Sequence, residues 1–178
     1  MKVHEEHKQK GPTEINIALI VVSTSRFEEK LDGKESSDKT IPLVKNMLEK
    51  EASISLLFHD IVPDSEKYIK KVLLNLLKDK NLHAIIFSGG TGISPKDITH
   101  ETIEPLLEKK IEGFGEIFRY LSYNEIGSSA ILSRALAGKM EDKAIFILPG
   151  SPNAVKLAFE KLILPELGHI IYLIRKKE

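Results

Sequence analysis

Four short apolar runs along the chain predict strands. They are residues 15–22 (INIALIVV), 53–62 (SISLLFHDIV), 83–88 (HAIIFS) and 143–148 (KAIFIL), each bounded by polar residues, proline or glycine. The first is a β-branched apolar run, the pattern of a strand that is buried on both faces of a parallel sheet. Glycines follow the third and fourth runs and predict that those strands end in turns.

Apolar residues elsewhere recur at helical spacing. The clearest stripe begins after Ser65, where five apolar residues between Ile69 and Leu77 share one helix face. Asp38 and Ser151 are suitable helix N-caps. We therefore predict a long polar loop over residues 23–38 and helices over residues 39–51, 65–77, 101–109, 114–123, 128–138 (ending at Gly138) and 151–164, with Pro165 opening the last helix.

The alternation of strands and helices predicts the fold class. It favours an α/β fold with three layers, in which a mostly parallel sheet carries helices on both faces and binds ligands at the carboxyl ends of its strands. A chain of 178 residues is the size of one ordinary domain. We expect a polar N-terminal tail over residues 1–13 and a single domain over residues 14–178.

Composition narrows the classes of function. Hydrophobic residues make up 42% and charged residues 29% of the chain, and the 26 basic and 26 acidic residues cancel. This balance gives no global attraction to nucleic acid or to an anionic membrane surface, so an anionic ligand needs a local site. The absence of cysteine excludes disulfides and thiolate chemistry. No apolar stretch reaches the ~20 residues of a membrane span, and we expect a cytoplasmic protein.

The segment SGGTGISPKD, residues 88–97, follows the third predicted strand. It is not a Walker loop, because Lys96 lies between Pro95 and Asp97 instead of between glycine and Ser or Thr. It also lacks the third glycine of a dinucleotide fingerprint, which makes a nicotinamide site a weak reading. Its glycines can still turn the backbone tightly and point amides at an anion, with Thr91 adding a hydroxyl and Lys96 a positive charge. A tight turn without a ligand is the alternative.

Two aspartates accompany this loop. Asp64 follows the second predicted strand and Asp97 the third, so a parallel sheet places both at the same edge. Paired carboxylates beside a phosphate loop are suited to Mg²⁺, which prefers oxygen ligands and bridges phosphates. Taken singly, Asp64 is explained as a turn residue and Asp97 as a helix cap. A second loop, LPGSPNA at residues 148–154, opens a helix whose N-terminus suits an anion.

Several separate motifs together resemble the MoaB/MogA family of molybdenum cofactor biosynthesis, over nearly the whole chain. They are SGGTGISPKD, VPD, EGFGEIFR, EIGSSAILSRALAG and LPGSPNAV, in the family's order. The resemblance implies a molybdopterin-binding α/β domain. Catalytic members transfer AMP from Mg-ATP to the terminal phosphate of molybdopterin and release pyrophosphate. The extended N-terminus and the segment EGFGEIFRYLSYNEIGSS resemble the MoaB branch.

The resemblance also implies roles for individual residues. Asp64 and Asp97 match the aspartates that serve magnesium and catalysis. The remaining matches imply a nucleotide, phosphate and pterin site made of Ser23, Ser25, Arg26, Ser88, Gly89, Gly90, Thr91, Gly92, Lys96, Ser133, Arg134, Pro149, Gly150, Ser151 and Asn153. Many adenylylating members have PRDVTPE where this chain has PKDITHE, so Lys96 and His100 replace an arginine and a proline. Lys96 keeps the positive charge but not the bidentate fork.

Two readings of the function follow from the resemblance. The first is a molybdopterin adenylyltransferase that uses ATP and Mg²⁺, and the second is a molybdopterin carrier or scaffold without turnover. The resemblance further implies a homo-oligomer, a trimer or a hexamer, and the apolar segment LGHIIYLI near the C-terminus is a candidate contact. A metal-insertion protein is an expected partner. The choice between molybdenum and tungsten stays open.

Overall fold

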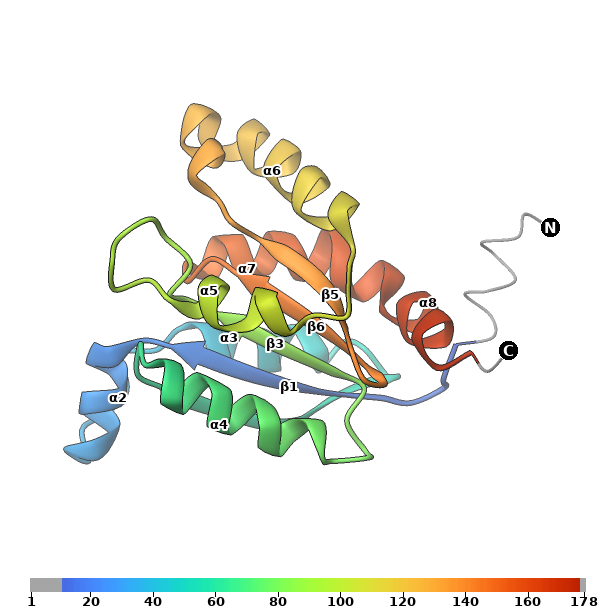
Figure 1. Ribbon diagram of the computed structural model, residues 1–178, viewed down its shortest axis with the longest axis horizontal. Coiled ribbons are helices and arrows are strands. Elements are labelled where there is room, and N and C mark those ends of the chain that lie inside the picture. The colour runs from blue at the N-terminus through green and yellow to red at the C-terminus, as the bar shows by residue number, and fades with distance from the viewer. Residues whose placement is uncertain (1–10, 177–178) are drawn as a thin grey trace.

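One six-stranded sheet forms the centre of the molecule in the computed structural model, which describes residues 11–176 (Figure 1). The strand order is β2-β1-β3-β6-β5-β4. The first four of these, in that order, pair in parallel, while β5 runs antiparallel to β6 and β4 antiparallel to β5. The bounds are β1 Ile15–Val22, β2 Ile54–Val62, β3 Ala84–Ser88, β4 Lys109–Lys110, β5 Leu136–Met140 and β6 Lys143–Leu148.

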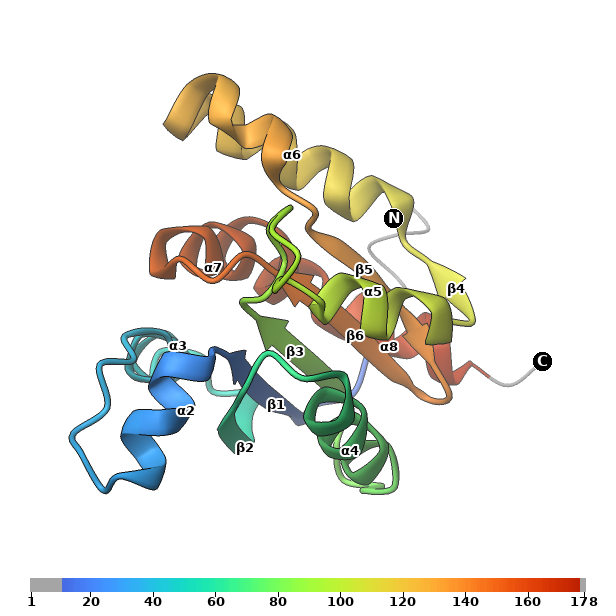
Figure 2. The same ribbon diagram turned by 60° about the vertical axis from the view of Figure 1, so that its left-hand side comes forward.

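Helices cover both faces of the sheet, so the predicted three-layer α/β fold is confirmed (Figure 2). Their bounds are α2 Thr24–Leu31, α3 Thr40–Leu48, α4 Glu66–Leu77, α5 Thr99–Ile103, α6 Glu112–Ile126, α7 Pro152–Ala158 and α8 Leu164–Arg175, with 3₁₀ turns at η1 Glu104–Leu106 and η2 Gly127–Leu132 and a π-helical turn at η3 Phe159–Ile163. Within the described residues, none of these helices is long and apolar enough to span a lipid bilayer.

The central strands are buried on both faces, as their apolar sequences predicted. Along β1, Ile17 and Leu19 belong to the core shared with α3, α6, α7 and α8, whereas Ala18 and Ile20 belong to the core shared with α4 and α5. All four side chains are fully buried. Two hydrophobic cores therefore hold the sheet, one on each face, and the sheet can present its loops on a rigid base.

Two predicted elements were wrong. The segment 23–38 is not all loop, because it contains α2. No residue of α2 is buried, and Phe27 is the member of α2 that packs against the hydrophobic core, with its ring 5.6 Å from that of Tyr68. The helix predicted over residues 128–138 ends as a 3₁₀ turn at Leu132, and β5 follows. The Ala-Gly composition of β5 disfavours a strand, but antiparallel pairing with β6 overrides it.

Smaller differences concern helix ends. The helix predicted over residues 101–109 begins earlier, as α5, and ends in a 3₁₀ turn before the short strand β4. The predicted cap at Asp38 is confirmed, since its carboxylate accepts hydrogen bonds from the amides of Thr40 and Ile41 at 3.2 and 2.8 Å. Ser151 Oγ likewise accepts from Ala154 N at 3.2 Å. The two predicted N-caps therefore located the starts of α3 and α7, whereas composition did not locate the ends of helices as well.

His83, directly before β3, should make the fold sensitive to mild acid. Its Nδ1 accepts a hydrogen bond from the amide of Asn16 at 3.0 Å, which requires an unprotonated nitrogen there. Burial, and next the positive charge of Arg175, lower the pKa of His83 below its usual 6.5. The unfolded chain then binds the proton more readily, so stability present above pH 6.5 is lost as the pH falls through that value toward the lowered pKa.

Unfolding free energies measured by urea titration between pH 8 and pH 5 test this expectation. The His83→Gln variant should lose less stability than wild type over that interval. The slope should become shallower without vanishing, because burial also lowers the pKa of His59 and His100. Equal slopes in both proteins would contradict a role for His83.

Candidate functional site

A cleft of about 680 Å³ lies at the carboxyl ends of the parallel strands. The loops that follow β1, β2, β3 and β6 meet there, on the left-hand side of Figure 1. Thirteen of the residues predicted from the sequence line this cleft: Ser23, Ser25, Arg26, Asp64, Gly89, Gly90, Thr91, Gly92, Asp97, Ser133, Pro149, Gly150 and Ser151. The parallel topology explains their convergence, because strands that are far apart in sequence end at the same edge.

The glycine loop after β3 needs its glycines for steric reasons. Gly89 has φ of +105°, and a Cβ on it would lie 2.3 Å from the carbonyl oxygen of Val22. Gly90 has φ of +61°, and a Cβ there would lie 2.4 Å from Thr99 Oγ1 and 2.8 Å from Asp64 Oδ1. No other residue fits these positions without a shift of the backbone or of the aspartate. The turn is therefore closely adapted to its surroundings.

The two glycine-containing loops are joined to each other. Ser88 Oγ donates a hydrogen bond to the carbonyl oxygen of Pro149 at 3.1 Å, and Gly89 N donates to that of Leu148 at 3.1 Å. A Cβ on Gly150 would lie 3.1 Å from Gly89 Cα. The loops after β3 and β6 thus form one continuous floor of the cleft.

Four successive backbone amides of the glycine loop, three of them in residues that line the cleft, have no hydrogen-bond acceptor within the described residues. Within residues 11–176, the N–H groups of Gly90, Thr91, Gly92 and Ile93 donate no hydrogen bond to a protein acceptor. Thr91 is buried, and its carbonyl and that of Gly92 are already engaged by Arg134. Successive amides of this kind make a concave site suited to an anion.

Asp64 presents one carboxylate oxygen to the floor. Its Oδ2 accepts hydrogen bonds from the amide and the hydroxyl of Thr24, at 2.9 and 2.8 Å. These bonds tie the loop after β2 to the start of α2 and fix the orientation of the carboxylate. The other oxygen, Oδ1, faces Gly90. Asp64 is therefore held in place by one oxygen while the second remains available.

Asp97 is arranged in a similar way on the other side of the loop. Its Oδ2 accepts a hydrogen bond from the amide of Ser94 at 3.2 Å, and a Cβ on Gly92 would lie 2.7 Å from that oxygen. In the part of the chain that the structure describes, no group of three or more His, Cys, Asp or Glu side chains could hold a metal ion. A cation at this edge would need ligand oxygens from a bound phosphate as well.

The charges that line the cleft are few. Arg26 contributes its guanidinium, which lies 3.5 Å from Oδ1 of the buried Asp38. The cleft lining also contains two negatively charged side chains, Asp64 and Asp97. Most of the remaining polar lining consists of hydroxyl groups from Ser23, Ser25, Ser37, Ser122, Ser129, Ser133, Ser151 and Thr91. The protein alone therefore does not neutralise a polyphosphate.

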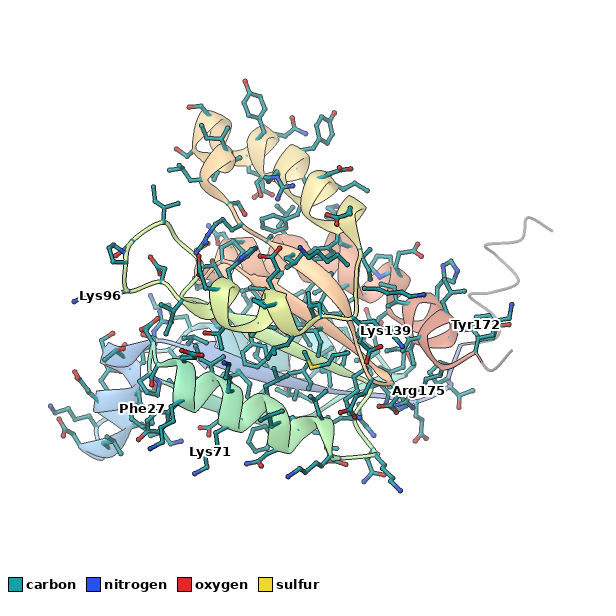
Figure 3. All side chains as sticks on the ribbon, in the orientation of Figure 1. Phe27, Lys71, Lys96, Lys139, Tyr172 and Arg175 are labelled. Carbon is teal, nitrogen blue, oxygen red and sulfur yellow. The ribbon has the colours of Figure 1, made fainter. Side chains whose placement is uncertain are left out.

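Four predicted residues do not line the cleft. Ser88 is buried and joins the two loops, Asn153 is exposed on α7, and Lys96 lies at the outer tip of the glycine loop with its side chain pointing away from the body (Figure 3). Arg134 lies behind the glycine loop and contacts its carbonyl groups. Lys96 in this position contributes no positive charge to the floor.

One wall of the cleft consists of residues that the sequence analysis did not assign to the site. It comes from α6 and η2 and consists of Phe118, Ser122, Ile126, Ser129, Ala130 and Leu132, with Ser37 and Ala154 adding to the rim. The available signals were the motifs EGFGEIFR and EIGSSAILSRALAG, which cover most of these residues. This wall faces the glycine floor, so the cleft has a partly apolar side and a polar, amide-rich side.

A second, more apolar groove of about 980 Å³ lies between the start of α6 and α8. Phe114, Ile117, Ile170, Leu173 and Ile174 are among its lining residues, and the side chains of Ile117 and Leu173 are about half exposed. Part of the C-terminal segment LGHIIYLI therefore lines a surface groove. That this surface mediates self-association stays a prediction.

The chain is similar to known proteins in both sequence and fold. A family model described as a probable molybdopterin binding domain matches residues 18–169. The molybdenum cofactor biosynthesis protein B of Bacillus subtilis is 44% identical over 173 residues, which cover 97% of each chain. A probable molybdopterin adenylyltransferase of Methanocaldococcus jannaschii is 40% identical, with 88% of this chain and 92% of that protein covered. A crystal structure of a molybdenum cofactor biosynthesis protein B, 40% identical, superimposes with a TM-score of 0.83 and covers 93% of this chain and 99% of its own.

Proposed function

The chain belongs to the MoaB/MogA family of molybdopterin-binding proteins, and from this premise we propose that it transfers AMP from Mg-ATP to the terminal phosphate of molybdopterin. The observation that carries the proposal is that the unbonded loop amides of Gly90, Thr91 and Gly92 lie in one cleft with Asp64 and Asp97. The name of the Methanocaldococcus relative, probable molybdopterin adenylyltransferase, supports the same activity.

The charge of the cleft supports a requirement for magnesium. One arginine faces two aspartates, so a triphosphate would meet a lining without enough positive charge. Mg²⁺ is commonly held by one or two carboxylates together with substrate phosphates. Asp64 Oδ1 and the carboxylate of Asp97 fit this arrangement, because each aspartate is anchored to the protein through Oδ2. When bound, the ion supplies neutralisation of the phosphate charge.

The proposed reaction requires little general acid or general base catalysis. A terminal phosphate oxygen of molybdopterin forms a bond to the α-phosphorus of ATP, the bond from that phosphorus to the bridging oxygen of the β-phosphate breaks, and pyrophosphate leaves with the electron pair. The nucleophile is already an anion, so no side chain has to remove a proton. Catalysis then rests on positioning and on electrostatic stabilisation.

The residues of the cleft suit these tasks. The amides of Gly90, Thr91 and Gly92 would donate to phosphate oxygens, and Arg26 would add a positive charge from the β1 side. The serine hydroxyls can form hydrogen bonds with the nitrogen and oxygen atoms at the edges of a pterin ring. Phe118 and Ala130 in the opposite wall are buried side chains that limit the access of water. Positioning of this kind, together with electrostatic stabilisation, accounts for most of the catalysis in phosphoryl transfer.

The proposal is tested by incubating the purified protein with magnesium, ATP and molybdopterin. We expect release of pyrophosphate and formation of adenylylated molybdopterin in equal amounts, and no release when magnesium is replaced by EDTA. Heat-denatured protein serves as the control. If native protein releases no more pyrophosphate than that control, the enzymatic assignment is wrong.

A molybdopterin carrier is the second candidate, and one observation favours it. Lys96 points away from the cleft, so the polyphosphate part of the site has only the Arg26 guanidinium as its own positive charge. A carrier would bind molybdopterin with the same affinity whether or not Mg-ATP is present. An adenylyltransferase would show coupled binding, because the two substrates meet in one cleft.

A further inference from the structure

We propose that Arg134, held by Glu101, is a positioning residue that fixes the glycine loop with its free amides facing the phosphate. This inference rests on the proposed function and deepens it. Arg134 lies between η2 and β5, directly after the cleft residue Ser133, yet its own side chain does not line the cleft. The guanidinium instead reaches the back of the loop.

The contacts of Arg134 are made to backbone carbonyls. Its Nε donates to the carbonyl oxygen of Thr91 at 2.9 Å, and Nη2 donates to that of Gly92 at 2.6 Å. The Glu101 carboxylate on α5 accepts from Nη1, and from Nη2 at 3.2 Å. The guanidinium is a rigid planar fork, so these bonds fix its plane and, through it, the two peptide groups.

Because of the geometry of the peptide bond, this contact with the carbonyls also orients the neighbouring backbone amides. In a trans peptide the C=O and the following N–H point in opposite directions. When Arg134 holds the carbonyls of Thr91 and Gly92, the amides of Gly92 and Ile93 must point away from it. Both amides donate to no acceptor within the described residues, and Gly92 lines the cleft. Arg134 therefore orders the donors without touching the ligand.

The loop needs such an anchor because its sequence is permissive. Gly92 is exposed and carries no side chain to fix its conformation, and Ile93 beside it is 73% exposed. A free segment of this kind would populate several peptide orientations, and a ligand would have to select one of them. Prior orientation of the amides removes that cost from binding.

An ordinary surface ion pair is the competing explanation. The side chains of Arg134 and Glu101 are 26% and 55% exposed, and the pair by itself would add little to stability. Glu101 does respond to its partner, since the hydrogen bond from Arg134 lowers the pKa of that carboxyl. The two explanations differ in one respect: only the positioning role depends on donation to the carbonyls.

A charge-reversed double variant separates the two roles. Calorimetric titration of Mg-ATP compares wild type, Arg134→Ala and the combination of Arg134→Glu with Glu101→Arg. Arg134→Ala should bind about tenfold more weakly, the effect of losing charge-assisted hydrogen bonds that orient the site. The double variant keeps an ion pair between the two positions but should not regain the affinity, because a glutamate cannot donate to a carbonyl.

Lys70→Ala is the matched control, because it removes another surface ion pair, that of Lys70 with Glu66 on α4, outside the cleft lining. It should bind Mg-ATP like wild type. Unchanged affinity in Arg134→Ala, or recovered affinity in the double variant, would overturn the positioning role.

Failure of the proposed function gives a different result, because wild type itself would then bind no Mg-ATP. The orientation of the loop is judged in that case from ¹⁵N NMR spectra of the free protein. The amide signals of Gly92 and Ile93 should shift or broaden in Arg134→Ala and stay unchanged in Lys70→Ala. Unchanged signals in both variants would overturn the inference.

Discussion

Replacing either Asp64 or Asp97 with asparagine should lower the rate of AMP transfer by about 100-fold or more. Each substitution removes one negative charge from the position where the site would hold magnesium against the phosphates, and such charge stabilisation contributes several kcal/mol to a transition state. The loss should be smaller at high magnesium concentration if the change weakens metal binding. It should persist at all concentrations if the aspartate acts on the bound complex.

Both asparagine variants should keep the fold. The amide oxygen of an asparagine at position 64 can still accept from Thr24, and one at position 97 can still accept from Ser94. Initial rates of pyrophosphate release at varied magnesium give the measurement, with the melting temperature as a check on folding. Asp60→Asn is the control, since Asp60 lies on β2 near Asp64 but pairs with Lys30 outside the cleft lining. Wild-type rates in both variants would remove these aspartates from the mechanism.

The part of the site that the sequence revealed has a simple physical basis. Apolar strands followed by glycine or aspartate mark the ends of strands, and a parallel sheet collects those ends at one edge. From the sequence alone, this rule brings Asp64, Asp97 and the two glycine-containing loops together. The motifs that resemble the MoaB/MogA family then pointed to the same residues, and the fold and the family were both confirmed.

The residues that escaped prediction depend on tertiary contacts. The wall of α6 and η2 reaches the cleft because that segment folds back over the sheet, which no local pattern encodes. Strand β5 is specified by its pairing with β6 and not by its Ala-Gly composition. Motif matching also could not distinguish a residue that lines the site from one that supports it. Arg134 was expected to form the site and instead lies behind the loop.

Gly89→Ala should destabilise the protein by about 4 kcal/mol, a large fraction of the stability of a typical domain. The left-handed φ of +105° costs an L-residue about 1–3 kcal/mol. The added Cβ would also lie 2.3 Å from the carbonyl oxygen of Val22. This oxygen belongs to the backbone of β1, which pairs with β3 up to Val21 and Ser88, so it cannot move without disturbing the sheet. Overpacking of that kind adds about 1–3 kcal/mol.

Two further alanine variants separate the two contributions, with the free energy of unfolding measured by urea titration. Gly33 has φ of +66° but nothing within 4 Å of its Cβ position, so Gly33→Ala should cost only the left-handed strain, about 1–2 kcal/mol. Gly150→Ala approaches the same loop contact from the other side, with its Cβ 3.1 Å from Gly89 Cα, and should be milder than Gly89→Ala. If Gly89→Ala lowers the free energy of unfolding no more than Gly33→Ala, the backbone of the glycine loop is easily displaced. A cleft floor that is easily deformed could not hold amides and aspartates in fixed positions around a phosphate.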